Sequence, residues 1–302
     1  MPVISTLRPA YPEHLRTEVE RYLEAIHFSG EYATAGLDEA MRYSLLAGGK
    51  RIRPVLALAT AEALGRPRAE VLALAGALEL IHTYSLIHDD LPAMDDDDLR
   101  RGRLTCHKVF GEDVAILAGD GLYAEAFRLL LTEQHGEPAH LLAAARELAS
   151  ATGVAGMVGG QYIDVADTAP EGAAGLRRLH ELKTGRLIAA SIECVLLLVG
   201  DHQPATIDAF HTFATELGVL FQIVDDILDV TGSEEALGKQ QGSDERLGKR
   251  TYVTEFGLDG ARRLAAESHE RARAALAGGP RIGIGSTGEL EQITDFIATR
   301  SY

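Results

Sequence analysis

The sequence predicts an all-α fold, and three observations support this prediction. Long stretches rich in Ala, Leu and Glu carry apolar residues at steps of three and four, which is the period of an amphipathic helix. No Val/Ile/Thr-rich alternating run is bounded by a two-residue hairpin turn, so strand signals are nearly absent. The chain has 302 residues, 46% of them hydrophobic, which is enough for one large core. We therefore expect a single domain over residues 1–302 with about ten helices.

Helical periodicity is strongest in six stretches. In residues 206–230, for example, Phe210, Phe213 and Leu217 recur on one face. Glycine clusters lie outside or between these stretches and mark places where the chain must turn or approach another segment closely: 48–49, 159–160 and 278–288. The six stretches are residues 69–87, 139–151, 176–199, 206–230, 258–277 and 289–298.

Composition excludes several classes of protein. With 29 Lys+Arg against 45 Asp+Glu, the formal net charge of −16 disfavours binding to nucleic acid or to an anionic membrane surface. Cys106 and Cys194 are far apart, which fits neither a disulfide scaffold nor a metal-binding spacing. The first residues lack the pattern of a signal peptide, and no apolar run reaches the roughly 20 residues of a membrane span. We therefore expect a cytoplasmic protein.

The second of two acidic motifs lies inside a predicted helix, in the stretch FQIVDDILDV. Its polar members recur at steps of three and four, so they share one helix face. They are Gln222, Asp225, Asp226 and Asp229. Carboxylates crowded on one face repel each other unless a cation neutralises them, and such hard oxygen ligands suit Mg²⁺. A solvated acidic face is the alternative, but apolar residues flank the aspartates on both sides.

The first acidic motif, HDDLPAMDDDD, follows a predicted helix and ends it. Pro92 disfavours helix at the residue before it, so we expect the chain to bulge there. Asp89 and Asp95 are six residues apart, a poor match to the helical period, and a bulge could return Asp95 to the side of Asp89. An acidic loop at a helix end is the alternative. Two motifs that both begin with an Asp-Asp pair favour instead a clamp in which several Mg²⁺ ions hold a diphosphate.

Cations that could bind a diphosphate cluster in the motif GGKRIRP. Lys50, Arg51 and Arg53 follow a glycine turn and surround the start of a helix, where Pro54 suits the first turn. Backbone amides at a helix start, together with Lys and Arg, form an anion site. The candidates are Gly49, Lys50 and Arg53, and a capped helix junction with solvated cations is the alternative.

Further candidates lie close to the first acidic motif in the sequence. His82 and Ser85 share a helix stripe with Asp89. Arg100 and Arg101 directly follow the aspartate run, and neutralisation of that run is their alternative role.

Two lysines lie in a glycine-rich segment after the second acidic helix. Lys239 and Lys249 bound the stretch GKQQGSDERLGK, which is in the right place for a flap that closes over a substrate. Composition alone motivates this expectation.

In this order, the motifs GGKRIRP, SLIHDDLPAMDDDDLRRG, MVGGQYIDV, KTG and FQIVDDILDVTG resemble the signature of short-chain trans-prenyl diphosphate synthases, most closely the bacterial farnesyl diphosphate synthases. The resemblance extends over residues 45–257 and more loosely to the C-terminus. It implies a bundle of long helices around a deep central cavity, usually a homodimer. It also implies a prenyltransferase that joins isopentenyl diphosphate to an allylic diphosphate with about three Mg²⁺ ions per site.

The resemblance further implies a role for individual residues. The metal ligands would be Asp89, Asp95, Asp225, Asp226 and Asp229. The allylic diphosphate would be held by Arg100, Lys183, Thr184, Gln222 and Lys239, and Lys249 would also face the leaving diphosphate. Isopentenyl diphosphate would be held by Gly49, Lys50, Arg53, His82 and Arg101.

The helix before Asp89 bears on product length. Tyr84 and Ser85 lie about one turn before Asp89, where a growing prenyl tail would run down the cavity. A bulky Tyr84 would form the floor of the cavity, which resembles enzymes that stop at the C15 product, farnesyl diphosphate. The alternative for Tyr84 is a core aromatic without this role.

Three other functions stay open. A geranylgeranyl or geranyl diphosphate synthase would share every motif and differ in the cavity floor. A terpene cyclase needs no isopentenyl site, so GGKRIRP and Arg101 disfavour it. A non-catalytic partner subunit would be expected to lack aspartates from one motif, and here both motifs are complete.

Overall fold

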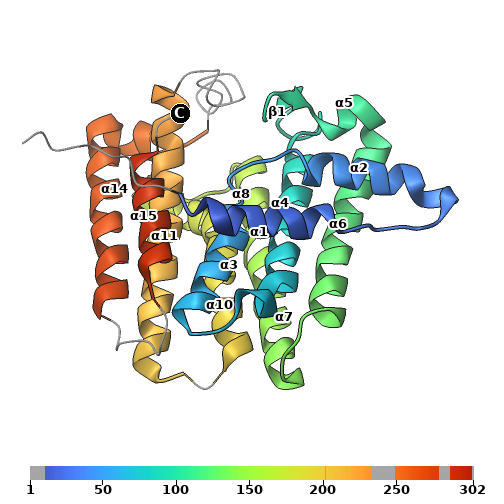
Figure 1. Cartoon of the computed structure of the whole chain (residues 1–302). Helices are drawn as coiled ribbons and strands as arrows, with labels where there is room; N and C mark the ends of the chain where they lie inside the picture. Colours follow the sequence, from blue (N-terminus) through green and yellow to red (C-terminus); the bar gives the residue numbers. More distant parts are fainter. Residues whose placement is uncertain (1–10, 201, 233–248, 279–285, 301–302) are drawn as a thin grey trace, which may run out of the picture.

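The computed structural model describes residues 11–200, 202–232, 249–278 and 286–300. Over these residues the chain is a bundle of helices with one very short hairpin, so the all-α prediction is confirmed (Figure 1). The α-helices are α1 (Glu13–Glu24), α2 (Ala35–Leu45), α3 (Ile52–Ala63), α4 (Leu72–Asp89), α5 (Cys106–Phe110), α6 (Glu112–Thr132), α7 (Pro138–Thr152), α8 (Met157–Val165), α9 (Gly172–His180), α10 (Arg186–Val199), α11 (Pro204–Thr231), α14 (Tyr252–Gly278) and α15 (Gly288–Thr299). Two 3₁₀ turns cover Tyr32–Thr34 and Arg68–Val71, and the hairpin strands are β1 (Leu99–Arg100) and β2 (Arg103–Leu104).

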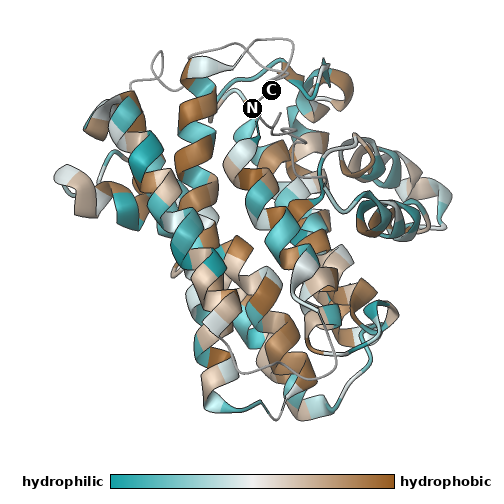
Figure 2. Cartoon of the chain, turned by 60° about the vertical axis from the view of Figure 1, so that its left-hand side comes forward, coloured by the Kyte–Doolittle hydropathy of each residue, from teal (hydrophilic) through white to brown (hydrophobic). Residues whose placement is uncertain are grey.

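The core lies between two groups of helices. Helices α11, α14 and α15 pack together on one side, α4, α6 and α2 on the other, and α3 and α10 join the two groups (Figure 1). Eleven of the twelve residues of α3 are buried, and α10 is nearly as deep, because both helices are apolar around most of their circumference. The outer helices carry hydrophobic and hydrophilic residues on different faces, as the brown and teal colours of Figure 2 show. Burial of the apolar faces stabilises the bundle.

Helix bounds follow the predictions with three differences. The described residues contain thirteen α-helices, more than predicted, because α5, α8 and α9 are too short to show a clear period. The predicted helix 176–199 is interrupted by a π-helical turn over Glu181–Gly185, which i, i+3 and i+4 patterns do not reveal. Helix α14 begins six residues before the predicted position 258, and Gly257 (φ 69°) breaks its regular backbone just before that point.

The first acidic motif bulges as predicted. Helix α4 ends at Asp89, and the amide of Asp95 then donates a hydrogen bond of 2.9 Å to the carbonyl oxygen of Asp89. The amide of Asp96 donates to the Leu91 carbonyl at 3.1 Å in the same turn. The hairpin that follows pairs Leu99 with Leu104. This turn chemistry folds the aspartate run back over the end of α4.

The ends of α4 and α11 that carry the aspartates lie at the same end of the bundle, together with β1 (Figure 1). Both helices therefore direct their acidic ends toward one region. The predicted flap falls largely on residues 233–248, and most of the glycine-rich loop on 279–285, and both segments lie outside the described residues.

Two helical stretches, 68–89 and 138–165, are long and apolar enough to cross a membrane by length and composition. The first contains α4, and 67% of its most apolar window is buried inside the bundle. The second consists of α7 and α8, between which the chain leaves the helix at residues 153–156. Neither is a clear membrane span.

Candidate active site

A cavity of about 990 Å³ lies at the end of the bundle where α4 and α11 present their aspartates. Its wall is formed by residues of α4, α8, α11, the π-turn and the two loops that precede α3 and follow α4. Of the residues that the sequence singles out, it is lined by Gly49, Lys50, Arg53, His82, Tyr84, Ser85, Asp89, Asp95, Arg100, Arg101, Lys183, Thr184, Gln222, Asp225, Asp226 and Lys249. Asp229 is buried next to this group and is not one of the described lining residues, and Lys239 lies outside the described residues.

Asp89 is the central carboxylate of the first motif. Its Oδ1 accepts a hydrogen bond of 2.9 Å from Nε2 of Gln161 on α8. Burial, reinforced by the charge of Asp95, raises the pKa of Asp89 to about 6, although the charge of Lys183 opposes the shift. A carboxylate in this setting is stabilised by any added positive charge.

Cations pair with three other aspartates around the first motif. Nζ of Lys249 lies 3.0 Å from Oδ1 of Asp95, across 154 residues of sequence. Arg100 pairs with Asp90, and its Nη2 also lies 3.1 Å from Oδ2 of Asp97. Burial raises the pKa of Asp90 to about 6 even though Arg100 lowers it. These pairs fix Arg100 and Lys249 at the cavity wall.

Two neighbouring aspartates of the second motif lie in different environments. Asp225 is half exposed and lies 3.2 Å from Nη2 of Arg300. Asp226 is buried, and its two oxygens accept hydrogen bonds of 2.7 Å from Gln222 Nε2 and from the backbone amide of Tyr252. Asp226 thereby joins α11 to the start of α14, while Asp225 stays accessible to a ligand.

The KTG triplet lies in the π-turn, where it meets α8. Lys183 pairs with Asp164 of α8. A Cβ atom on Gly160 would lie 2.3 Å from the backbone nitrogen of Lys183, so only glycine permits this approach. A π-turn adds one residue to a helix and re-aims the side chains that follow. The turn thus brings Lys183 and Thr184 to the cavity.

The basic loop before α3 faces the other side of the cavity. The guanidinium of Arg101 covers Gly49, where a Cβ atom would lie 2.7 Å from Cζ, and it donates to the Gly48 carbonyl. Burial lowers the pKa of Arg53 to about 10, and burial together with the arginines around His82 lowers the pKa of that imidazole, which stays neutral. Cations thus gather opposite the acidic motifs.

The donor set fits magnesium. In the described part of the chain, no three His, Cys, Asp or Glu side chains converge closely enough to hold an ion by themselves. Mg²⁺ takes one or two carboxylates and completes its shell with water and substrate phosphates. Asp89 with Asp95, and Asp225 across the cavity, offer such partial sets of hard oxygen ligands.

Several residues that line the cavity were not predicted from the sequence. Gln161 lies within the motif MVGGQYIDV, which itself was a usable signal. Phe221 begins the second acidic motif, whereas Arg300 carries no such signal, because its place depends on how α15 packs: the Arg300 guanidinium lies 4.3 Å from the centre of the Phe221 ring. Glu79 lies within the apolar helix α4, so no charged motif marked it as a site residue.

We expect Gly160→Ala to lower the free energy of unfolding by about 1–3 kcal/mol, because the added methyl group forces α8 away from the π-turn. Gly36→Ala is the matched control, since nothing lies within 4 Å of a Cβ atom there. Urea unfolding followed by circular dichroism measures both changes. Equal stability of the two variants would contradict the close packing at Gly160.

Comparison with known proteins agrees with this geometry. The family model described as polyprenyl synthetase matches residues 34–276. The chain is 45% identical to the chloroplastic geranylgeranyl pyrophosphate synthase of Capsicum annuum over 267 residues, covering 87% of this chain and 71% of that protein. It is 44% identical to the farnesyl diphosphate synthase of Escherichia coli over 266 residues, covering 87% and 89%.

A solved structure shows the same fold. The geranyltransferase of Helicobacter pylori, determined in complex with magnesium and isoprenyl diphosphate, superposes with a TM-score of 0.82 at 30% identity, covering 97% of this chain and 98% of that one. The match of the family model over most of the chain and the shared fold lead to one conclusion. The chain belongs to the polyprenyl synthetase family, and it is a prenyltransferase.

Proposed function

We propose that this prenyltransferase condenses isopentenyl diphosphate with dimethylallyl and then geranyl diphosphate, and releases farnesyl diphosphate (C15) and pyrophosphate. The observation that supports it best is the shared cavity: two acidic motifs and a cluster of cations line one space, and Tyr84 lies on its wall. The arrangement offers one place for a metal-bound allylic diphosphate and a second, metal-free place for isopentenyl diphosphate.

Charge determines the chemistry of the site. The C–O bond of the allylic diphosphate breaks to give a carbocation and pyrophosphate, so the leaving group must be stabilised. When bound, Mg²⁺ held by Asp89, Asp95 and Asp225 supplies positive charge to that leaving group. Lys183 and Lys249 lie at the same cavity and add hydrogen bonds to it.

Carbon–carbon bond formation takes place beside this group. The double bond of isopentenyl diphosphate attacks the carbocation, and Arg53 and Arg101 hold its diphosphate. The new cation then loses a proton, for which pyrophosphate is the proposed acceptor. Among the described lining residues, Glu79 is the only carboxylate on the isopentenyl side, and it already pairs with Arg51. Exclusion of water protects the cation from capture.

Tyr84 supports a C15 product. It directly precedes Ser85, which lies one turn before Asp89, and it packs edge-on against Tyr123 of α6, with 5.1 Å between ring centres. Tyr123 in turn contacts Phe127 at 5.4 Å and shares a hydrogen bond of 3.2 Å with Thr152. Aromatic rings held from behind in this way form a rigid floor. The similarity to a plant geranylgeranyl pyrophosphate synthase keeps a C20 product as the second candidate.

A homodimer is part of the proposal. Exposed large apolar side chains concentrate between Val109 and Val165, on α5 to α8, where they include Ile116, Leu117 and Leu142. Exposed apolar surface of this kind is typical of a protein interface. A cytoplasmic location stays a prediction from the sequence.

The proposed activity is tested with purified protein, dimethylallyl and isopentenyl diphosphates and Mg²⁺, and the products are sized by chromatography after dephosphorylation. We expect mainly C15 product and its loss when EDTA removes the metal. Absence of any condensation would refute the proposed function, and mainly C20 product would refute only the chain length.

Asp89→Asn should lower kcat about a hundredfold to a thousandfold, because it removes a charged metal ligand while it preserves shape. The control is Asp259→Asn, since the Asp259 side chain is 88% exposed on α14. Steady-state assays at saturating Mg²⁺ compare the two. An unchanged kcat for Asp89→Asn would show that Asp89 is not a metal ligand.

Tyr84→Ala should shift the product toward C20, because the shorter side chain opens the cavity floor. Tyr123→Phe keeps the ring behind Tyr84 and is expected to leave product length unchanged. Product sizing at equal substrate ratios compares the two variants. A C15 product from Tyr84→Ala would show that the floor lies elsewhere.

Size-exclusion chromatography with light scattering tests the dimer. We expect about twice the 32.4 kDa of one chain, and a shift toward one chain mass for Leu117→Glu, whose side chain is 55% exposed on α6. A wild-type mass of one chain at micromolar concentration would contradict the proposal.

A further inference from the structure

Arg51 behaves differently from the two cations that flank it. All three border the cavity and Lys50 and Arg53 are candidate ligands, but the Arg51 side chain is wholly buried, at 0% exposure. The Arg51 backbone is left-handed (φ 53°), a conformation that residues other than glycine rarely adopt. A conformation of this kind persists only when surrounding contacts hold it in place.

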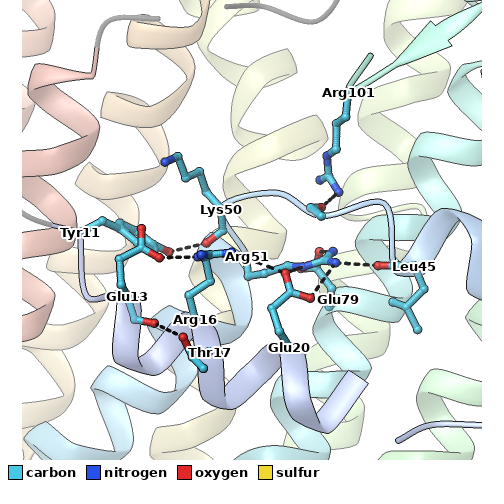
Figure 3. Close-up of polar contacts among 11 residues, drawn as sticks. Tyr11, Glu13, Arg16, Thr17, Glu20, Leu45, Lys50, Arg51, Glu79 and Arg101 are labelled. Carbon is cyan, nitrogen blue, oxygen red and sulfur yellow. Dashed lines mark hydrogen bonds and ion pairs between the residues drawn. The ribbon is translucent and has the colours of Figure 1, made fainter. Parts of the chain in front are cut away.

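Those contacts come from three helices (Figure 3). The Arg51 guanidinium donates to Glu79 of α4 at 2.6 Å and to Glu20 of α1 at 2.9 Å. It also donates to the carbonyl oxygen of Leu45, the last residue of α2, at 2.7 Å. One side chain therefore ties the loop before α3 to α1, α2 and α4.

Glu79 lies at the base of the cationic cluster. It is 1% exposed, lines the cavity, and precedes His82 by one helix turn. Its Oε1 pairs with Arg51, while its Oε2 is buried and has no hydrogen-bond partner among the described residues. The Glu79 charge also acts on two further guanidiniums, because it opposes the effect of burial on the pKa values of Arg53 and Arg101.

The loop is held from both sides. Arg101 reaches it from the hairpin and donates to Gly48, on the opposite side from Arg51 (Figure 3). The Lys50 carbonyl accepts a hydrogen bond of 2.7 Å from Tyr11. The Lys50 side chain points away from Arg51. Its Nζ lies 5.3 Å from the centre of the Phe296 ring. The Arg51 anchor therefore determines where Lys50 and Arg53 leave the backbone.

We propose that the buried Arg51–Glu79 pair is a positioning element of the isopentenyl diphosphate site. Arg51 holds the loop 48–53 in its left-handed turn, and Glu79 supplies the countercharge that allows Arg53 and Arg101 to lie together before the substrate arrives. This inference rests on the proposed function, since it assumes that these cations bind isopentenyl diphosphate. Neither Arg51 nor Glu79 needs to touch the substrate.

The experiment separates positioning from stability by measuring KM for each substrate. Glu79→Gln keeps the shape but removes the countercharge, and Arg51→Lys keeps the charge but cannot reach three acceptors at once. We expect each to raise the KM for isopentenyl diphosphate about tenfold, and to change the KM for geranyl diphosphate less than about twofold. A role in stability alone would lower the melting temperature and leave the ratio of the two KM values unchanged.

Arg68→Lys is the matched control. Arg68 also bridges two glutamates of neighbouring helices, Glu18 of α1 at 3.1 Å and Glu62 of α3 at 2.6 Å, but it is not part of the cavity lining. We expect both KM values of this variant to equal those of the wild type. A tenfold rise in the KM for isopentenyl diphosphate in Arg68→Lys would overturn the assignment to Arg51.

Two further outcomes would overturn the inference. One is an unchanged KM for isopentenyl diphosphate in Glu79→Gln, and the other is an equal rise in both KM values. If Glu79→Gln does not fold, Glu20→Gln decides the matter, because it replaces only the outer carboxylate that Arg51 contacts by a neutral amide; we expect the KM for isopentenyl diphosphate to rise about threefold there, and no rise overturns the inference. A wild-type chain without condensation activity would instead defeat the proposed function.

Discussion

The structure depends on how buried carboxylates are neutralised at one end of a helix bundle. Two helices bring their aspartates to the same cavity, and like charges at this depth destabilise each other unless cations accompany them. Lys249 pairs with Asp95, Arg300 with Asp225, and Arg100 with Asp90. The first two pairs join distant segments to the acidic motifs, so the contacts that balance the charge of the site also hold those segments in the fold.

Close packing of the backbone gives these charges their positions. The approach of α8 to the π-turn requires glycine at position 160, and it brings Gln161 and Asp164 beside Asp89 and Lys183. The apolar helices α3 and α10 fill the space beneath. The polar cavity thus lies on a rigid apolar base, which suits a reaction that must exclude water.

Periodicity was sufficient to predict most of the long helices, because burial on one face imposes steps of three and four, but the stretch that forms α6 was not singled out. The return of Asp95 to Asp89 also followed from local rules, since Pro92 ends the helix there. The π-turn did not, because one inserted residue leaves no clear mark in the composition. The separate role of Arg51 was equally hidden: its neighbours in GGKRIRP are chemically alike, and only the packing of α1, α2 and α4 shows which cation turns inward. The sequence also did not predict that Arg300 belongs to the site, because its position depends on how the C-terminal helix packs.

The net charge of −16 excluded anionic partners at first, yet the proposed substrates are anions. The location of the charges resolves this: acidic residues become part of an anion receptor once Mg²⁺ neutralises them. Isothermal titration calorimetry of the wild-type chain with inorganic pyrophosphate, with Mg²⁺ at a concentration far above its dissociation constant or with EDTA, tests this claim most directly. The account predicts binding that depends on Mg²⁺ and is at least about tenfold weaker in EDTA. Equal affinity in both conditions would contradict it.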